Sequence, residues 1–547
     1  MSCFLYCYIV ALNDIKIILQ CIIAATKMGI PSYFSYIIRN YSKVVRNITF
    51  VKQNVHFNSL YMDCNSIIYD TITMLEGIYT NLTPSEFETI LLQKIAEKIE
   101  EYIFLINPTN TVYIAFDGFA PEAKLKQQIV RRYKNSYFST IKFGDENDKV
   151  SKFNKNEITP GTEFMKRLSK YMEDRFLYSE KRYNVKRVII STPNEDGEGE
   201  HKLYEYMRGN VDTSQDVAIY GLDADLIMLS IIHLKCVKNI YIFREAPAFM
   251  NSSIPVDNKN DVHFLDVLAL TECILHKMNC KFHNSGRIID YVFMCFFLGN
   301  DFLPHLPSLN IRTHGIDIIL DIYRMHIGNY VDRNFVSLDN DKIVWKNVKR
   351  FIHELAKKEH EFLLIEHKGR SKFDTHIYPE KTPKEKEAVF QNIPVIYRAE
   401  EKYICPSEPF WEDRYYKVLF FDWKKKENPE KEKIEICKNY IDGLCWVFNY
   451  YFGKKRFTPL HNQNAPKGAG FECQMGQPLR NLDAQWCKWY YKYKYGPLLK
   501  DIYMNMPILD EDRDFDYSSD IKRSITISNF EPMALSWSYS RYMWESK

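Results

Sequence analysis

The sequence predicts an α/β protein with a mostly parallel sheet as its nuclease-like core, flanked by helices, and a mainly α-helical second region. Three short apolar segments that each run into a polar turn carry this prediction: 58–66, 111–118 and 217–230. Amphipathic segments lie between them, as expected where helices connect parallel strands. From about residue 436 a helical pattern resumes with many aromatic residues. We expect this second region to close over the site that the sheet carries.

Two helices can be placed from their patterns and end signals. Residues 85–106 form a long amphipathic segment, for which Ser85 is the expected N-cap, with acidic residues close behind it. Residues 286–298 form a second helix, followed by Gly299 and Pro304 as stop signals.

Four polar segments are predicted to be loops or linkers. Residues 366–400 are charged and contain proline, which predicts a linker or mobile loop, and 423–433 predict a solvated loop. Residues 453–485 resemble a loop insertion, and the acidic stretch 510–520 is expected to be solvated.

Composition excludes some classes of protein. The chain has 547 residues, of which 46% are hydrophobic, so it can bury a large core, and low-complexity disorder is excluded for most of it. Its 73 basic and 70 acidic residues give a net charge of only +3, so local clustering must indicate any polyanion partner. The 13 cysteines contain no CxxC pair, which favours reduced thiols in an intracellular protein, in cytoplasm or nucleus.

The first 27 residues differ from the rest. Their two apolar runs are broken by Asn13, Asp14 and Lys16, which argues against a membrane-spanning helix. No basic segment precedes the first run, so a signal peptide is not expected. We expect a peripheral helix or an extension that the working protein does not use, and no membrane association.

Carboxylates follow the predicted strands and one predicted helix. Because sites in open α/β sheets form at the carboxyl ends of strands, these acids are candidate ligands. If the DAD segment is extended, its two aspartates share one face. The seven candidates are Asp63, Asp117, Glu198, Glu200, Asp223, Asp225 and Asp301.

Such a set suits two-metal hydrolysis of a phosphodiester. Mg²⁺ prefers oxygen ligands, and two ions about 4 Å apart can activate a water and stabilise the leaving oxygen. In the stretch STPNEDGEGEHK, Gly197 and Gly199 would let the backbone bring Glu198 and Glu200 to one metal centre. Any one of these acids, taken alone, is more simply explained as a turn or helix cap.

A basic segment follows Asp117 directly. Lys124, Gln128 and Arg131 fall at helical spacings on one face, and the long side chain of Arg132 can reach a common ligand. Arginine binds phosphate through two parallel hydrogen bonds and lysine acts as a point charge. The segment therefore predicts a pocket for a terminal phosphate, although a solvated helix face explains it equally when it is taken alone.

Long matching segments identify the chain as resembling the Xrn family of 5′→3′ exoribonucleases. They occur in order along the chain: MGIPSYF (28–34), MDCNSIIYD (62–70), AFDGFAPEAKLKQQIVRRY (115–133), ITPGTEFM (158–165), DGEGEHKLYEYMR (196–208), YGLDADLIML (220–229), FFLGNDFLPHLPSL (296–309), YIDGLCWVFNYYFG (440–453) and WYYKYKYGPLLKDI (489–502). The resemblance implies an extension at 1–27, a nuclease domain at 28–335 and a helical region at 336–547, together a minimal catalytic core.

The resemblance also implies roles for the residues named above. The seven acids match the family's metal ligands for two Mg²⁺ ions, with Mn²⁺ as a substitute, and Lys124, Gln128, Arg131 and Arg132 match its 5′-monophosphate pocket. Trp446 and Tyr69 match the residues that stack on the first base, although Tyr69 replaces the family's histidine. Cys273, His276 and Cys280 lack zinc-knuckle spacing, so no zinc is expected.

The implied function is processive 5′→3′ degradation of single-stranded RNA, including mRNA, that carries a 5′-monophosphate, to 5′-mononucleotides by a monomer. Two alternatives remain open: a structure-specific flap-type endonuclease, which shares this kind of acidic core, and a non-catalytic RNA-binding scaffold.

Overall fold

The computed structural model describes residues 33–78, 83–129, 153–221, 223–245, 262–337, 342–382, 398–420, 428–453 and 489–506, with the short stretches 385–386, 388–389 and 396. The expectations for 1–27, most of 453–485 and 510–520 lie outside these residues. Among the helices described, none is both long and apolar enough to cross a bilayer.

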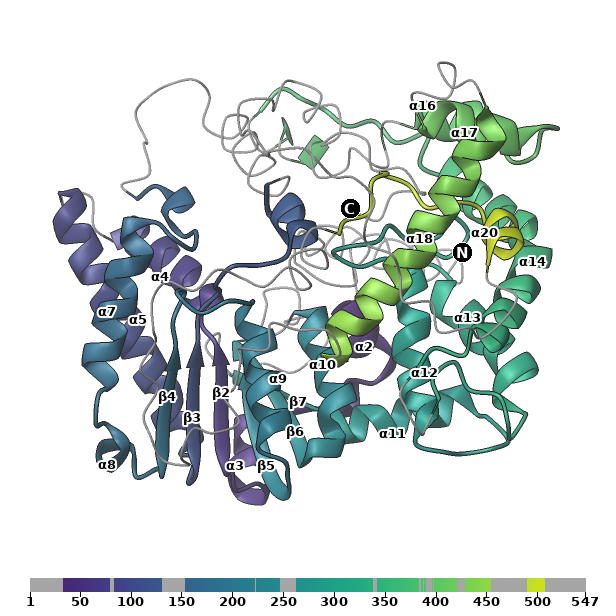
Figure 1. Ribbon diagram of the computed structural model, residues 1–547. Helices are drawn as coiled ribbons and strands as arrows, with labels where there is room; N and C mark the ends of the chain where they lie inside the picture. Colours follow the sequence, from purple (N-terminus) through teal and green to yellow (C-terminus); the bar gives the residue numbers. More distant parts are fainter. Residues whose placement is uncertain are drawn as a thin grey trace, which may run out of the picture.

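The described strands form one seven-stranded sheet in the order β1-β7-β6-β5-β2-β3-β4 (Figure 1). Neighbours from β6 to β4 are parallel, and β7 pairs antiparallel with both β6 and β1. The predicted α/β class with a mostly parallel sheet is confirmed. The strands are β1 (Val45–Asn47), β2 (Ser59–Asp63), β3 (Thr111–Ala115), β4 (Arg187–Ser191), β5 (Asp212–Tyr220), β6 (Val237–Glu245) and β7 (Val262–Asp266).

Helices cover both faces of the sheet, and strand side chains alternate between two cores. On β2, Leu60 and Met62 enter one core while Tyr61 enters the other, as the two-residue period of a strand requires. Residues of α4 (Asn65–Ile78), α5 (Pro84–Ile106) and α7 (Glu163–Phe176) line the first core. Residues of α9 (Gly199–Gly209), α10 (Ala224–His233) and α11 (Val267–Met278) line the second. This two-sided burial explains the near-continuous apolar strands.

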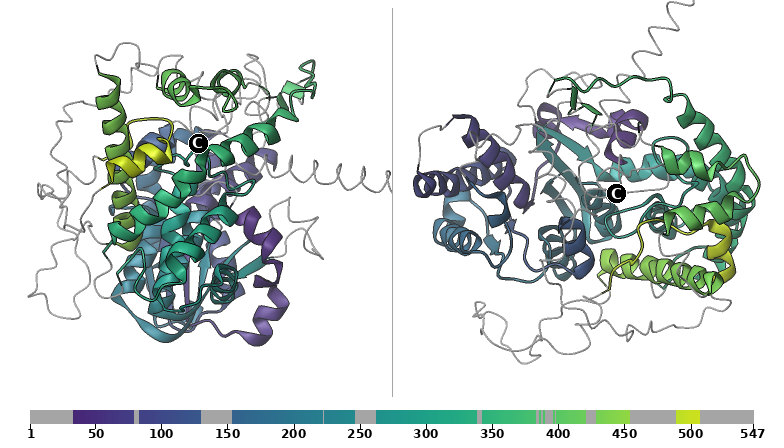
Figure 2. Two further views of the ribbon diagram at one scale, coloured as in Figure 1. Left: turned by 90° about the vertical axis from the view of Figure 1, so that its right-hand side faces the viewer. Right: turned by 90° about the horizontal axis from the view of Figure 1, so that it is seen from above.

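The remaining helices form the helical part of the chain. They are α12 (Gly286–Cys295), α13 (Gly315–Tyr323), α14 (Trp345–Ser371), α16 (Ala399–Ile404), α17 (Trp411–Leu419), α18 (Pro429–Phe452) and α20 (Leu499–Asn505). Of these, α12, α13 and most of α18 extend the second core, while α16 and α17 line a separate third core. Shorter elements are α2 (Tyr33–Asn40), α3 (Ile48–Asn54), α8 (Glu180–Tyr183), the 3₁₀ helices η2 (Ser42–Val44), η4 (Lys155–Glu157), η5 (Leu234–Cys236) and η7 (Phe296–Leu298), and the π-helix η8 (Arg324–Gly328). Seen from above, α4, α5 and α7 lie on the opposite side of the molecule from α16, α17 and α18 (Figure 2).

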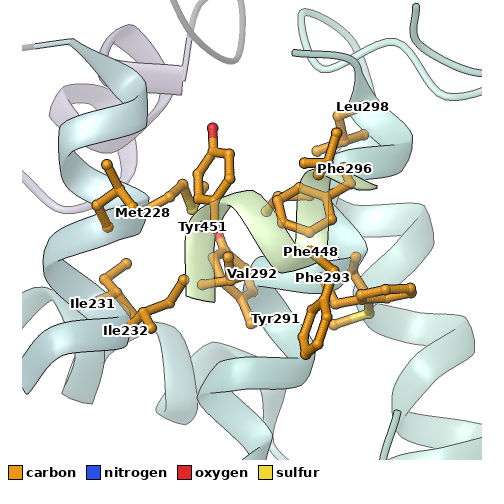
Figure 3. Close-up of a cluster of buried hydrophobic side chains, with 14 of the residues drawn as sticks. Met228, Ile231, Ile232, Tyr291, Val292, Phe293, Phe296, Leu298, Phe448 and Tyr451 are labelled. Atoms are coloured by element: carbon orange, nitrogen blue, oxygen red, sulfur yellow. The ribbon is translucent and has the colours of Figure 1, made fainter. Parts of the chain in front are cut away.

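Helix α18 packs against α10, one of the helices that cover the sheet, and against α12. Figure 3 shows Phe448 and Tyr451 of α18 among side chains from α10 and α12. The ring of Phe448 lies 6.1 Å from that of Phe293, and the ring of Tyr451 lies 5.2 Å from that of Phe296. Phe335, beside the predicted domain boundary, belongs to the same core. The boundary itself stays a prediction.

Three local predictions differ from the structure. The N-cap of α5 is Thr83, not Ser85: Thr83 and Glu86 form a capping box, and Pro84 occupies the first helical position. The predicted linker at 366–400 is helical up to Ser371, where α14 ends. Helix α18 begins at Pro429, inside the loop predicted at 423–433.

Candidate metal centre

Four neighbouring parallel strands end at one level, and each leads into an acid. In the strand register Asp63 lies beside Ala115, which lies beside Ser191, and Met62 lies beside Tyr220. The segments after β5, β2, β3 and β4 therefore leave the sheet at the same edge. Asp63 is the last residue of β2, Asp117 follows β3, Glu198 and Glu200 follow β4, and Asp223 and Asp225 follow β5.

The acid pairs that follow β4 and β5 begin helices. Glu198 is the N-cap of α9 and Glu200 lies in its first turn, while Asp223 is the N-cap of α10 and Asp225 lies in its first turn. The DAD segment was considered as an extended strand; instead it turns from strand into helix. The exposed N–H groups of a helix start favour negative charge, so each helix stabilises its own pair of acids.

Glycines make the close approach of these segments possible. A Cβ on Gly199 would lie 2.6 Å from Oδ1 of Asp63, and one on Gly118 would lie 1.6 Å from the carbonyl oxygen of Glu195. Gly197 has a φ of +99°, which side chains disfavour. Gly199 therefore allows the acids to approach one another because any side chain at this position would collide with Asp63.

Asp301 joins these acids from the turn after η7, where Gly299 has a φ of +86°. A lysine connects it to them: Nζ of Lys124 lies 2.8 Å from Oδ2 of Asp301 and 2.7 Å from Oε2 of Glu198. Lys124 is only 2% exposed. The acidic cluster is hereafter the seven acids Asp63, Asp117, Glu198, Glu200, Asp223, Asp225 and Asp301.

The carboxylates of the acidic cluster affect one another's ionisation. Burial raises the pKa of Asp63 well above its usual value, and the charges of Asp117 and Asp223 raise it further. Burial and the neighbouring charge of Asp301 raise the pKa of Asp225 to about 7. Burial also raises the pKa of Glu200. These shifts reflect mutual repulsion and loss of water, both of which a bound cation would relieve.

Lys124 compensates for part of this charge. Burial by itself would lower the pKa of the Lys124 ammonium, but Asp301 and Glu198 outweigh that effect and raise the pKa well above its usual value. One ammonium group cannot neutralise seven carboxylates, however. Oδ1 of Asp63 is buried and has no hydrogen-bond partner among the residues that the structure describes. Oxygen donors, excess negative charge and this unpartnered oxygen fit a divalent cation.

The remaining polar contacts fix individual acids. Asp117 accepts hydrogen bonds from the backbone N–H of Gly199, at 2.7 Å, and from the side chain of Asn65. Ligand atoms of Glu198, Glu200 and His201 lie within 4.8 Å of one another. Lys202 donates to the carbonyl oxygens of Phe116, at 2.9 Å, and Thr192, at 2.8 Å, and thereby holds the segments after β3 and β4 together.

Two tyrosines of α18 contact the cluster, and neither was among the residues predicted from the sequence. The hydroxyl of Tyr450 donates to Oε1 of Glu198, and that of Tyr451 donates to Oδ1 of Asp225. Both lie in the aromatic run GLCWVFNYYFG, where dense aromatic residues indicate only a buried helix. Helical spacing from Trp446 could have placed Tyr450 on the same face, but nothing local indicates the carboxylates.

The predicted substrate-binding residues have different positions. Gln128 lies in the helical stretch 122–129 that begins beside the cluster and also carries Lys124, while Arg131 and Arg132 lie outside the described residues. Tyr69 is partly buried on α4, which starts directly after β2. These four assignments stay predictions.

The structure does not support the stacking role expected for Trp446. Its side chain is fully buried. The ring stacks on Tyr450 at 5.0 Å and on Trp489 at 5.1 Å, and the edge of Phe302 lies 4.9 Å away. No ring face is left for a base. Trp446 lies on a packed helix and is part of the core. The match to the family motif could not show that this side chain is buried.

Comparison with known proteins places these features in a family. Residues 28–246 match the model for the XRN 5′-3′ exonuclease N-terminus, and residues 282–405 and 399–455 match that for the Xrn1 helical domain. The 5′-3′ exoribonuclease 2 of Arabidopsis thaliana is 30% identical over 336 residues, covering 51% of this chain and 33% of the relative. The Drosophila melanogaster and Gallus gallus proteins are each 26% identical, over 76% of this chain and 53% of the relative.

The chain thus spans between a third and about half of the length of these relatives. It also matches the solved catalytic core of Rad2 in complex with DNA, with a TM-score of 0.31 and 13% identity over 72% of this chain and 95% of that one. A similarity this weak supports no conclusion about function. The two family models follow one another from residue 28 to residue 455 and include all seven acids. The chain therefore belongs to the Xrn family, whose nucleases use divalent metal ions.

Proposed function

We propose that the protein is a 5′→3′ exoribonuclease that processively degrades 5′-monophosphorylated single-stranded RNA to 5′-mononucleotides. The observation that carries this proposal is the convergence of seven carboxylates at the ends of four parallel strands and one turn. Relatives named as 5′-3′ exoribonucleases support the direction and the substrate. We also propose the division into a nuclease domain at 28–335 and a helical region at 336–547, with RNA turnover as the physiological process.

The acidic cluster would hold two Mg²⁺ ions, for which Mn²⁺ can substitute. Divalent ions bound there would polarise the scissile phosphodiester and lower the pKa of a water nucleophile. The chain's own contribution is to preorganise the ligands: strand ends fix Asp63 and Asp117, and helix starts fix the pairs at 198–200 and 223–225. Glu198, Glu200, Asp225 and Asp301 are buried, so cations held there would act strongly on a bound phosphate because bulk water is kept away.

The 5′-phosphate would bind beside the cluster. Lys124 and Gln128 lie one turn apart on the helical stretch 122–129, and Arg131 and Arg132 follow three and four positions after Gln128 in the sequence, so the four side chains supply an ammonium, an amide and two guanidinium groups along one short segment. Such a pocket prefers a monophosphate and excludes bulkier capped or triphosphate ends. We propose that Tyr69 stacks on the leading base, a contact that tolerates any sequence.

The 5′ end of the RNA tests this proposal. Purified protein with Mg²⁺ is incubated with a 3′-labelled RNA that carries a 5′-monophosphate, a 5′-hydroxyl or a 5′-triphosphate, with Asp225→Ala as the inactive control. We expect loss of the monophosphate RNA only. Equal cleavage of all three RNAs at internal positions would instead indicate a flap-type endonuclease, and tight binding without cleavage would indicate a scaffold.

A further inference from the structure

Two adjacent tyrosines reach two different acids of the cluster from a distant helix. Tyr450 donates to Glu198, at the start of α9, and Tyr451 donates to Asp225, at the start of α10. In sequence the partners are 252 and 226 positions apart. Both phenol groups are buried, so the hydrogen bonds form away from water, where their geometry is best defined.

The rings of both tyrosines are themselves held in place. Tyr450 stacks on Trp446 at 5.0 Å and lies 3.9 Å from the ring of His201. Tyr451 packs against Phe296 in the core shown in Figure 3. Because core packing fixes the orientation of both rings, the two hydroxyl groups are in position before any ligand binds.

Burial alone does not require these particular partners. A buried tyrosine hydroxyl needs a hydrogen-bond partner, but a backbone carbonyl is sufficient. Tyr440 on the same helix donates to the carbonyl oxygen of Pro304 at 3.0 Å. Tyr450 and Tyr451 instead donate to carboxylates, and they do so as neutral groups. The acids therefore gain a fixed orientation from a donor that adds no positive charge to compete with a cation.

Each bond also uses only one oxygen of its carboxylate. Tyr451 contacts Oδ1 of Asp225, which leaves Oδ2 for another ligand. Tyr450 contacts Oε1 of Glu198, while Oε2 pairs with Lys124. A donor on one oxygen fixes the rotamer that presents the other oxygen, which is how partners outside the coordination sphere tune metal sites.

We propose that Tyr450 and Tyr451 are positioning residues through which α18 sets the divalent-metal affinity of the acidic cluster. The inference rests on the proposed metal site. It adds that the nuclease domain binds metal with full affinity only when α18 is docked on α10. Tyr451 has the larger effect of the two, since Lys124 also holds Glu198.

The direct test measures Mn²⁺ binding without RNA, by the electron paramagnetic resonance signal of free Mn²⁺. Tyr451→Phe removes a single oxygen and is expected to weaken Mn²⁺ binding about tenfold to a hundredfold. Tyr450→Phe is expected to have a smaller effect in the same direction. Tyr416→Phe is the matched control: its buried hydroxyl donates at 2.6 Å to Asp501, a carboxylate outside the cluster. It should bind Mn²⁺ as the unchanged protein does.

A double-mutant comparison separates positioning from general loosening of the fold. If Tyr451 acts through Asp225, Tyr451→Phe should weaken Mn²⁺ binding little further in a protein that already carries Asp225→Ala. RNA cleavage by Tyr451→Phe should recover at high Mg²⁺, so that the Mg²⁺ concentration for half-maximal rate rises more than the maximal rate falls. Circular dichroism confirms that each variant is folded.

The outcomes are distinguishable. Unchanged Mn²⁺ affinity in Tyr451→Phe, or an equal loss in Tyr416→Phe, overturns this inference and leaves the proposed function intact. A full further loss in the Asp225→Ala background also overturns it. Absence of Mn²⁺ binding by the unchanged protein overturns the proposed metal site and this inference together.

Discussion

Tyr451 donates a hydrogen bond to Asp225 although 226 positions separate the two residues, and both side chains are buried. The contact joins the last turn of α18 to the first turn of α10. The acidic cluster is therefore built from both matched regions of the chain. Changes in the helical part that leave every acid in place should still alter the site.

Loss of an acid should abolish catalysis without unfolding the protein. We predict that Asp225→Asn lowers the rate of RNA hydrolysis about a thousandfold or more, because metal-assisted stabilisation of the transition state contributes several kcal/mol. Initial rates with a 5′-monophosphate RNA measure this. Asp317→Asn, which removes a surface partner of Lys277, should retain the full rate. A modest loss in Asp225→Asn would argue against its proposed role.

Lys124 should stabilise the metal-free protein. Lys124→Met leaves Glu198 and Asp301 buried without their counter-charge, which we expect to cost about 3 kcal/mol in the free energy of unfolding. Denaturant titration without divalent ions measures the cost. Mg²⁺ should restore most of the lost stability, because added cations replace the missing positive charge.

Lys126→Met is the control for this change. Lys126 lies two positions further along the same helical stretch, and its side chain is 37% exposed where it pairs with Glu122. Exposed pairs contribute little, so this variant should unfold nearly as the unchanged protein does. A similar deficit in both variants, or one that Mg²⁺ does not reduce, would contradict the prediction for Lys124.

The close approach at Gly199 should tolerate no side chain. In Gly199→Ala the new Cβ would lie 2.6 Å from Oδ1 of Asp63, which displaces that carboxylate and should lower both Mn²⁺ affinity and the hydrolysis rate at least tenfold. Gly209→Ala changes the other end of α9, where nothing lies within 4 Å of the new Cβ. It should leave both quantities unchanged, and equal behaviour of the two variants would exclude the steric explanation.

Glu359 should make stability depend on pH. Its carboxylate accepts hydrogen bonds from the backbone N–H groups of Leu499, at 2.9 Å, and Lys500, at 3.3 Å, at the start of α20. Burial nevertheless raises the pKa of Glu359 to about 8. The folded state then holds a proton that the unfolded chain, with its ordinary pKa near 4.5, releases.

The sign of the effect follows from this difference. The stability that Glu359 contributes is complete below about pH 4.5 and is lost as pH rises towards about 8, by at most about 1.4 kcal/mol per pH unit. Glu359→Gln cannot ionise, so its melting temperature should fall less between pH 6 and pH 8.5 than that of the unchanged protein. Parallel curves for the two proteins would show that Glu359 does not retain its proton.

Much of the site could be predicted from the sequence because strand ends carry a local signal. An apolar run that stops at Asp63 or Asp117 indicates a strand and its end together, and parallel strands bring their ends to one edge. The structure confirms this plan for β2, β3 and β5. The capping box of Thr83 and Glu86 was also present in the sequence, three positions apart, and assigning the cap to Ser85 was wrong because Pro84 already starts the helix.

Contacts between distant segments could not be predicted in this way. Nothing near Tyr451 in the sequence indicates Asp225, and the burial of Trp446 depends on Trp489 and Phe302, which come from other segments. The turn at Asp223 was misjudged because a short DAD segment fits both a strand and a helix start. In each case the local sequence pattern allowed more than one structure, and packing between distant segments determined which one forms.

The length of the RNA products tests the central claim most directly. A uniformly labelled, single-stranded RNA with a 5′-monophosphate is incubated with the protein and Mg²⁺, and products are separated by size from the first seconds onward. We predict that 5′-mononucleotides appear at once beside full-length RNA, with few fragments of intermediate length, and that Asp225→Asn leaves the full-length RNA uncut. Fragments from internal cuts that precede any mononucleotide would contradict hydrolysis from the 5′ end.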